Sequence, residues 1–119
     1  MKHQHITALV AFNTNLQLAH WQADTVTNVH RTLGDLYEQT VDLVDKLAEV
    51  FMGKRNDRTF LNADIKLVAG ADVKELLAVG IQAVADARTG CTAGEDDDLL
   101  NILADISSAI NRAKYLLKI

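Results

Sequence analysis

Apolar side chains, with one threonine among them, recur at intervals of three and four residues between positions 26 and 51, and this run constrains the fold most strongly. Its members are Val26, Val29, Leu33, Leu36, Thr40, Leu43, Val44, Leu47, Val50 and Phe51. The intervals match the 3.6-residue turn of an α-helix, so these side chains share one stripe. The sequence therefore predicts an amphipathic helix over residues 25–52 that ends at Gly53.

Three further helices are expected, over residues 4–22, 72–89 and 95–117. The first should turn the following side chains inward: Ile6, Leu9, Val10, Leu16 and His20. Proline is absent from the 119 residues, and the six glycines lie mostly between periodic segments. Gly80 lies inside a helix, where glycine costs about 1 kcal/mol relative to alanine, and therefore indicates close packing. Four amphipathic helices predict an all-α four-helix bundle forming one domain over residues 1–119.

The segment between the second and third helices lacks a helical period. We expect its apolar side chains to anchor it to the bundle; these are Phe60, Leu61, Ile65, Leu67 and Val68. Basic residues gather only at positions 53–58 (GKRNDR), where we expect a solvated loop. Because the net charge is −4 and duplex DNA is bound through clustered cations, DNA binding is not expected.

Three features bear on where the chain acts. No apolar run approaches the roughly 20 residues that cross a bilayer. The first residues lack the apolar stretch and cleavage site of a secretion signal. The single cysteine, Cys91, cannot form an intramolecular disulfide. Together these features predict a cytoplasmic protein without membrane attachment.

Two of the four histidines, His20 and His30, lie close together in the sequence, and two carboxylates follow them. On a helical wheel with Val29 at the origin, Asp45 lies near about 160° and Glu49 near about 200°, away from the core stripe. Imidazole combined with carboxylate suits iron, manganese or zinc. The other interpretation of Asp45 and Glu49 is a solvated acidic face.

One chain cannot bring all four groups to one ion, because fifteen residues, about 22 Å of helix, separate His30 from Asp45. Gly34, Tyr37 and Val41 form a semi-apolar flank between the core stripe and the carboxylates, on which a second chain could pack. Two chains packed antiparallel through this helix would join the histidines of one chain to the carboxylates of the other.

Two segments of the sequence, LAHWQ (18–22) and VHRTLGDLYEQTVDLVDKLAEVFMG (29–53), resemble the Dps proteins, which are mini-ferritins. The shared pattern is a His-Trp pair near the end of the first helix, then a histidine, then a D..D..AE segment before a glycine. Counted from His30, the matching positions are Leu33, Asp42, Asp45, Ala48 and Glu49. The segment GEDDDLLNILADISSAINRAKYLL (94–117) is similar to the last helix of that family.

The resemblance implies a ferritin-like four-helix bundle that assembles through twofold dimers into a homo-oligomeric shell, for instance a dodecamer. It also implies a ferroxidase centre between two chains, to which one chain gives His20 and His30 and the other gives Asp45 and Glu49. Fe(II) would be oxidised there by peroxide or dioxygen and stored as ferric mineral. Asp35 and Glu38 are further candidate ligands.

The sequence departs from the family pattern at one position, and its interval between His20 and His30 is two residues shorter than the usual one. The aspartate expected four residues after the second histidine is Gly34 here, and Asp35 is rotated by about 100° from that position. The departure keeps a second interpretation open. In that interpretation the chain is a helical assembly protein of the same fold with a decayed or structural metal site, for instance one holding zinc, and has no ferroxidase activity.

Overall fold

The computed structural model describes residues 1–58, 63–68, 70 and 72–119, most of which lie in four helices. The helices are α1 (His3–Gln22), α2 (Asn28–Arg55), α3 (Val73–Thr89) and α4 (Asp97–Leu117). The described residues contain no β-strand, which confirms the all-α prediction for this part of the chain. Each predicted helix is present, and no boundary is shifted by more than three residues.

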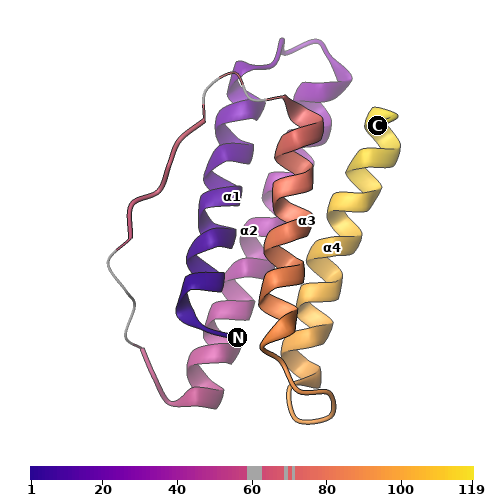
Figure 1. The fold of residues 1–119 in the computed structure, drawn as a ribbon. Helices are drawn as coiled ribbons and strands as arrows, with labels where there is room; N and C mark the ends of the chain where they lie inside the picture. The colour runs from indigo at the N-terminus through magenta and orange to yellow at the C-terminus, as the bar shows by residue number, and fades with distance from the viewer. Residues whose placement is uncertain (59–62, 69, 71) are drawn as a thin grey trace.

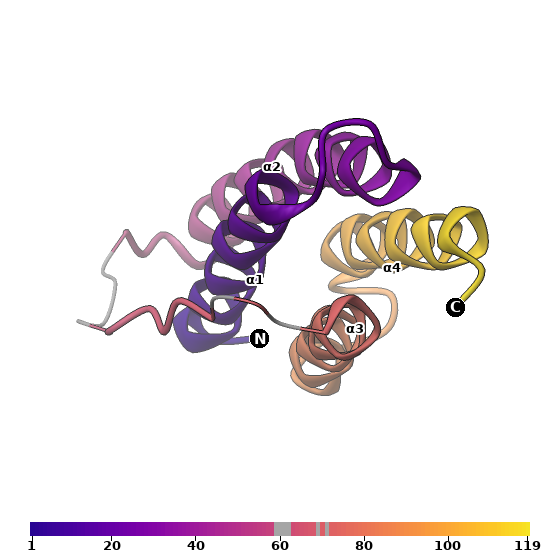
Figure 2. The same ribbon diagram turned by 90° about the horizontal axis from the view of Figure 1, so that it is seen from above.

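Figures 1 and 2 show how the four helices are arranged. α1 and α2 are antiparallel across a short turn, and so are α3 and α4. α2 ends and α3 begins at opposite ends of the bundle, so these two helices run in the same direction. α1 packs against α2 and α3, and α4 packs against the same two helices. The result is an up-down-down-up four-helix bundle with one long crossover, which confirms the predicted bundle.

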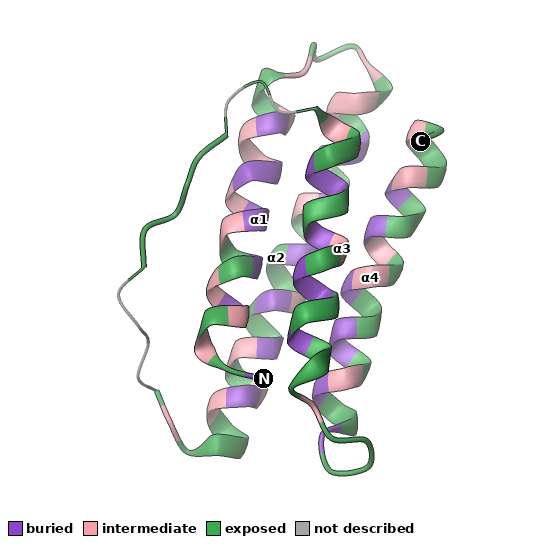
Figure 3. Cartoon of the chain, viewed as in Figure 1, coloured by how far each residue is buried: buried purple, intermediate pink, exposed green. Residues whose placement is uncertain are grey.

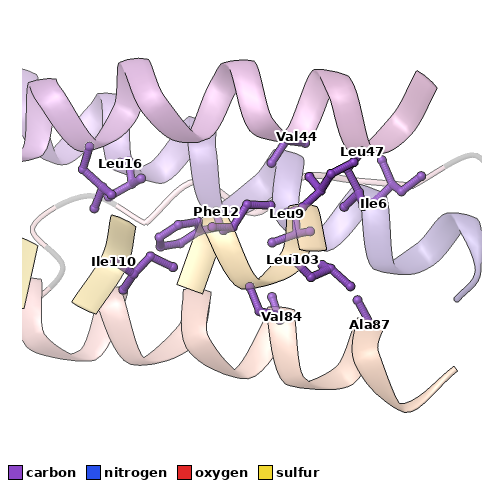
Figure 4. Close-up of a cluster of buried hydrophobic side chains, with 14 of the residues drawn as sticks. Ile6, Leu9, Phe12, Leu16, Val44, Leu47, Val84, Ala87, Leu103 and Ile110 are labelled. Atoms are coloured by element: carbon purple, nitrogen blue, oxygen red, sulfur yellow. The ribbon is translucent and has the colours of Figure 1, made fainter. Parts of the chain in front are cut away.

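The buried faces of the helices meet along the bundle axis (Figure 3), and Figure 4 shows one cluster of the core. Buried side chains confirm most of the predicted α2 stripe: Leu33, Leu36, Thr40, Val44, Leu47 and Phe51. Two valines predicted to face inward do not do so: Val10 of α1 is 38% exposed, and Val26 of the predicted α2 stripe is 84% exposed. Val26 lies in the turn before α2 and so has no helix face to share.

α2 lies further toward the C-terminus than the predicted 25–52. At its start, the Thr27 hydroxyl accepts a hydrogen bond from the backbone N–H of His30 (3.2 Å), which caps the helix. At its end, the helix continues through Gly53 and stops where Asn56 adopts a left-handed φ of 49°. Asparagine tolerates this conformation, so the predicted end at Gly53 was wrong because Asn56 supplies the cap.

α3 confirms both the acidic cap and the close packing predicted at Gly80. The Asp72 carboxylate accepts a hydrogen bond from the backbone N–H of Glu75 (3.2 Å), and the helix ends directly before Gly90. Gly80 lies against the ring of Phe12 from α1, and a Cβ at this position would overlap the ring. The glycine therefore permits a closer approach of α1 and α3 than alanine would.

Polar side chains of α1 hold the described part of the link between α2 and α3. The side-chain amide of Asn15 donates to the carbonyl of Lys66 (3.0 Å) and accepts from the backbone N–H of Val68 (2.9 Å). Gln22 accepts from the backbone N–H of Gly70 (3.0 Å). The link is thus fastened alongside α1 (Figure 1) through its backbone.

The apolar side chains of the link do not anchor it as predicted. Ile65, Leu67 and Val68 are all exposed, so the prediction is wrong for these three residues. The physical reason is that the link is held to α1 by hydrogen bonds from its backbone groups to α1 side chains, which do not require its own side chains to be buried. Phe60 and Leu61 lie outside the described residues.

Ion pairs tie the end of α2 to the start of α4. Asp96 is 3% exposed, lies 3.2 Å from Arg55, and accepts the backbone N–H of Thr92 (2.9 Å). Lys54 lies 3.2 Å from Asp98. The predicted loop is therefore wrong at Lys54 and Arg55, because both residues lie in the last turn of α2 and are paired within the chain, although both are exposed as predicted.

The substitution Asp96→Asn should lower the thermal midpoint, Tm, by several degrees at neutral pH. The N–H of Thr92 and the charge of Arg55 lower the pKa of Asp96 below its ordinary value of 3.8. A carboxylate whose pKa is lowered in the folded state stabilises the fold at any pH above its unfolded-state pKa. This stabilisation is lost as the pH falls through the folded-state pKa. The Tm difference should therefore be constant near neutral pH and shrink below about pH 4.

Circular dichroism melts between neutral and acidic pH measure this difference. Asp64→Asn, at an exposed carboxylate of the link, is the matched control and should leave Tm nearly unchanged. A difference that grew on acidification would contradict the assigned role of Asp96.

Candidate metal centre

A cleft of about 480 Å³ opens where the end of α1 meets the start of α2. Its lining residues are Gln17, His20, Trp21, Thr25, His30, Arg31, Gly34, Asp35, Tyr37 and Glu38. Four predicted metal ligands, His20, His30, Asp35 and Glu38, therefore share one cleft. Trp21 is 65% exposed, which places a large aromatic surface at this end of the bundle.

His20 and His30 hold each other through reciprocal hydrogen bonds. Nδ1 of His20 lies 2.6 Å from the carbonyl oxygen of His30, and Nδ1 of His30 lies 2.8 Å from the carbonyl oxygen of His20. The two rings stack, with centroids 4.0 Å apart and planes inclined by 25°. We call this pair the histidine clasp. It also closes the end of α1, because carbonyls in a last helical turn lack helical partners.

The clasp determines which ring nitrogens are free. A carbonyl oxygen can only accept a hydrogen bond, so each Nδ1 must carry a proton, and Nε2 of the neutral ring keeps its lone pair. Neither Nε2 is hydrogen-bonded to any residue that the structure describes. Metal-binding histidines commonly have this arrangement, in which the other ring nitrogen donates to a carbonyl or carboxylate. The clasp therefore presents two nitrogens suited to metal binding.

The stacking of the rings restricts how the two nitrogens can be used. A metal ion lies in the plane of its imidazole at about 2.1 Å from the nitrogen. With ring centroids 4.0 Å apart and planes only 25° from parallel, one ion cannot lie in both planes at that distance. Each imidazole in its present position can therefore bind only its own ion.

Gly34 makes room for the clasp. A Cβ at this position would lie 2.7 Å from Cε1 and 3.0 Å from Nδ1 of His20, so a side chain here and the ring cannot both keep these positions. We predicted Gly34 as part of a flank for a second chain, but the His20 ring of the same chain already occupies the space above it. The interval of one helical turn from His30 was the only sequence signal for this role.

Asp35 and Glu38 bring negative charge to the cleft. Both are exposed and line it together with the clasp. Within the described residues, no three histidine, cysteine, aspartate or glutamate side chains lie close enough together to hold a metal ion. The cleft of one chain thus provides part of a ligand set, in which two nitrogens are fixed and the carboxylates are exposed at the surface.

Asp45 and Glu49 lie on the exposed face of α2, as the helical wheel predicted. The structure does not bring them to the clasp, because fifteen residues of continuous helix, about 22 Å, separate Asp45 from His30. The hydrogen bond that protonated Glu49 donates to the Asp45 carboxylate, together with the negative charge of Asp45, raises the pKa of Glu49. The two carboxylates thus act on each other and form a second acidic group on the same helix.

A groove of about 320 Å³ between α1 and α2 lies next to Asp45. Apolar side chains form most of its lining: Ile6, Val10, Tyr37, Val41, Val44 and Ala48. The predicted semi-apolar flank is therefore a groove on the surface of the α1–α2 pair, between the clasp and the two carboxylates.

No helix among the described residues is both long enough and apolar enough to cross a bilayer. Taken together, the fold and the cleft define a four-helix bundle with paired histidines where α1 and α2 meet. Residues 20–117 match the model of a family of unknown function, DUF5856, and the chain belongs to this family. The match begins at His20. It therefore includes both histidines of the clasp as well as Asp45 and Glu49. No curated protein and no solved structure matches the chain.

Proposed function

We propose that the chain is a ferritin-like, Dps-like subunit that binds Fe(II) between two copies of itself, oxidises it and stores the ferric product. The observation that carries the proposal is the histidine clasp, which fixes both Nδ1 protons on backbone carbonyls and leaves both Nε2 atoms for metal ions. The single long crossover between α2 and α3 supports the ferritin-like assignment, because ferritin-like bundles have one such connection.

The proposed chemistry divides the work between iron and protein. Each Fe(II) ion gives up one electron, and a peroxide molecule takes two electrons and two protons to become two waters. The protein supplies nitrogen and oxygen ligands and holds two ions close together, which is the usual contribution of a protein to metal redox chemistry. His20 and His30 would each bind one ion, consistent with the near-parallel rings.

The second copy supplies the missing carboxylates in this proposal. Asp45 and Glu49 lie beyond reach of their own clasp, and an apolar groove lies between the two groups. An antiparallel twofold pairing of α1–α2 faces would cover this groove and bring the carboxylates of each chain to the clasp of the other. Such dimers would be the building unit of a homo-oligomeric shell in the cytoplasm.

A second candidate function is a helical assembly protein whose clasp holds a structural ion such as zinc. Gly34 favours it, because the absence of a side chain there leaves the cleft with fewer fixed carboxylates than a redox centre of two iron ions would use. Zinc accepts a ligand set of imidazole and carboxylate and performs no redox chemistry. The two functions differ in whether added Fe(II) is oxidised.

The experiment compares two glycine substitutions within α2. Gly34→Ala should abolish most Fe(II) oxidation by peroxide or dioxygen, because the new Cβ displaces the His20 ring. Gly53→Ala is the matched control, since a Cβ there meets nothing within 4 Å, and it should keep full activity. Ferric absorbance gives the rate, and light scattering gives the oligomer size. An unmodified protein that is monomeric, or that oxidises no Fe(II) with either oxidant, would exclude the ferroxidase proposal.

A further inference from the structure

Glu38 lies on the same face of α2 as His30 and Gly34, because the three residues follow one another at intervals of four. Gly34 is the position over which the His20 ring lies, so Glu38 is one helical turn beyond the clasp. Its side chain lines the same cleft. Glu38 makes no ion pair with any residue that the structure describes, and its carboxylate is therefore available.

Asp35 is the other carboxylate of the cleft, and its position is less suitable than that of Glu38 for binding a metal ion at the clasp. It follows Gly34 directly and is therefore turned by about 100° around the helix from the face that carries the clasp. Asp35 also lines a neighbouring cleft between α2 and α4, together with Arg112. Its carboxylate is thus shared between two clefts, and each of them contains a cation, Arg31 in one and Arg112 in the other.

The charge balance of the cleft requires an anionic ligand. Two neutral imidazoles contribute no charge, and Arg31 adds a positive charge to the same lining. The charge of a divalent ion bound only by one of these imidazoles would remain uncompensated next to a guanidinium group. A carboxylate on the clasp face of α2 reduces this positive charge within one chain.

We propose that Glu38 is the carboxylate ligand that completes the histidine half-site within one chain. Glu38 is exposed and unpaired, so rotation about its side-chain bonds carries the carboxylate toward the imidazoles at little cost. The assignment rests on the proposed function only in taking the clasp as a metal site. It holds whether the ions bound by the two imidazoles are iron undergoing oxidation or structural zinc.

Cobalt(II) binding to the full chain tests the assignment without any measurement of activity. Titrations followed by calorimetry and by visible absorption give the affinity and the ligand geometry. Glu38→Gln should weaken cobalt(II) binding by at least about 10-fold, since even residues that only support a metal ligand account for about 10–100-fold. Asp42→Asn removes an exposed carboxylate one turn further along α2 and should change the affinity by less than about 3-fold.

The remaining arms separate failure of this assignment from failure of the site. If His20→Ala with His30→Ala abolishes binding while Glu38→Gln binds as the unmodified chain does, the assignment to Glu38 is overturned and the clasp stands. If Asp35→Asn, and not Glu38→Gln, reduces the affinity, the carboxylate is Asp35 and the assignment is again overturned. Binding that survives loss of both histidines overturns the site itself. Thermal melts without metal should show Glu38→Gln as stable as the unmodified chain.

Discussion

Mixed dimers made from two inactive variants should recover Fe(II) oxidation. One variant carries His20→Ala and His30→Ala, and the other carries Asp45→Ala and Glu49→Ala. Each variant alone lacks half of every proposed shared site and should be inactive. In a twofold mixed dimer, one interface site keeps all four groups and the other keeps none, so the rate should return to about half of the unmodified value.

The recovery distinguishes a shared site from a site within one chain. If His20, His30, Asp45 and Glu49 served the same ion in one chain, every chain of the mixture would still be defective and mixing would recover nothing. Different affinity tags on the two variants allow the mixed dimers to be purified and verified. A mixture of the unmodified chain with a chain carrying all four substitutions is the control. Verified mixed dimers without recovery would contradict the shared site.

The fold could be predicted from the sequence where a helix has one buried face. The stripe of α2 and the cap at Asp72 follow from periodicity and local hydrogen bonding, so most of the stripe and the cap itself were predicted correctly. The predicted helix end at Gly53 was wrong because the left-handed conformation of Asn56, three residues later, determines where α2 ends. The exposure of Val10 could not be predicted either, since periodicity indicates which face is apolar but not how widely the neighbouring helix covers it.

The candidate site was predictable in its ligand types but not in its geometry. The short interval between His20 and His30 indicated a pair, and the wheel placed Asp45 and Glu49 outside the core. The reciprocal contacts with backbone carbonyls depend on how the end of α1 meets α2, which spacing does not encode. The role of Gly34 depends on a ring from another helix, so it required the structure.

Changes to the packing of Phe12 against Gly80 should have large effects on stability. Phe12 is 1% exposed and fills the contact between α1 and α3 (Figure 4). Phe12→Ala should lower the free energy of unfolding by about 3–5 kcal/mol, the usual cost of removing a buried aromatic ring. Gly80→Ala should also destabilise the protein, by about 1–3 kcal/mol, because its Cβ would overlap the ring and force the two helices apart.

The two substitutions should not be additive. Once the ring is absent, the overlap disappears, and alanine at position 80 gains its helix preference over glycine, about 1 kcal/mol. Gly80→Ala should therefore change sign, destabilising the unmodified chain and stabilising Phe12→Ala. Urea unfolding of all four proteins gives the coupling energy directly. Gly53→Ala, at an open position of α2, should stabilise both backgrounds equally. If Gly80→Ala had the same effect with and without the ring, Phe12 and Gly80 would not be in contact, and the packing of α1 on α3 would differ from that described.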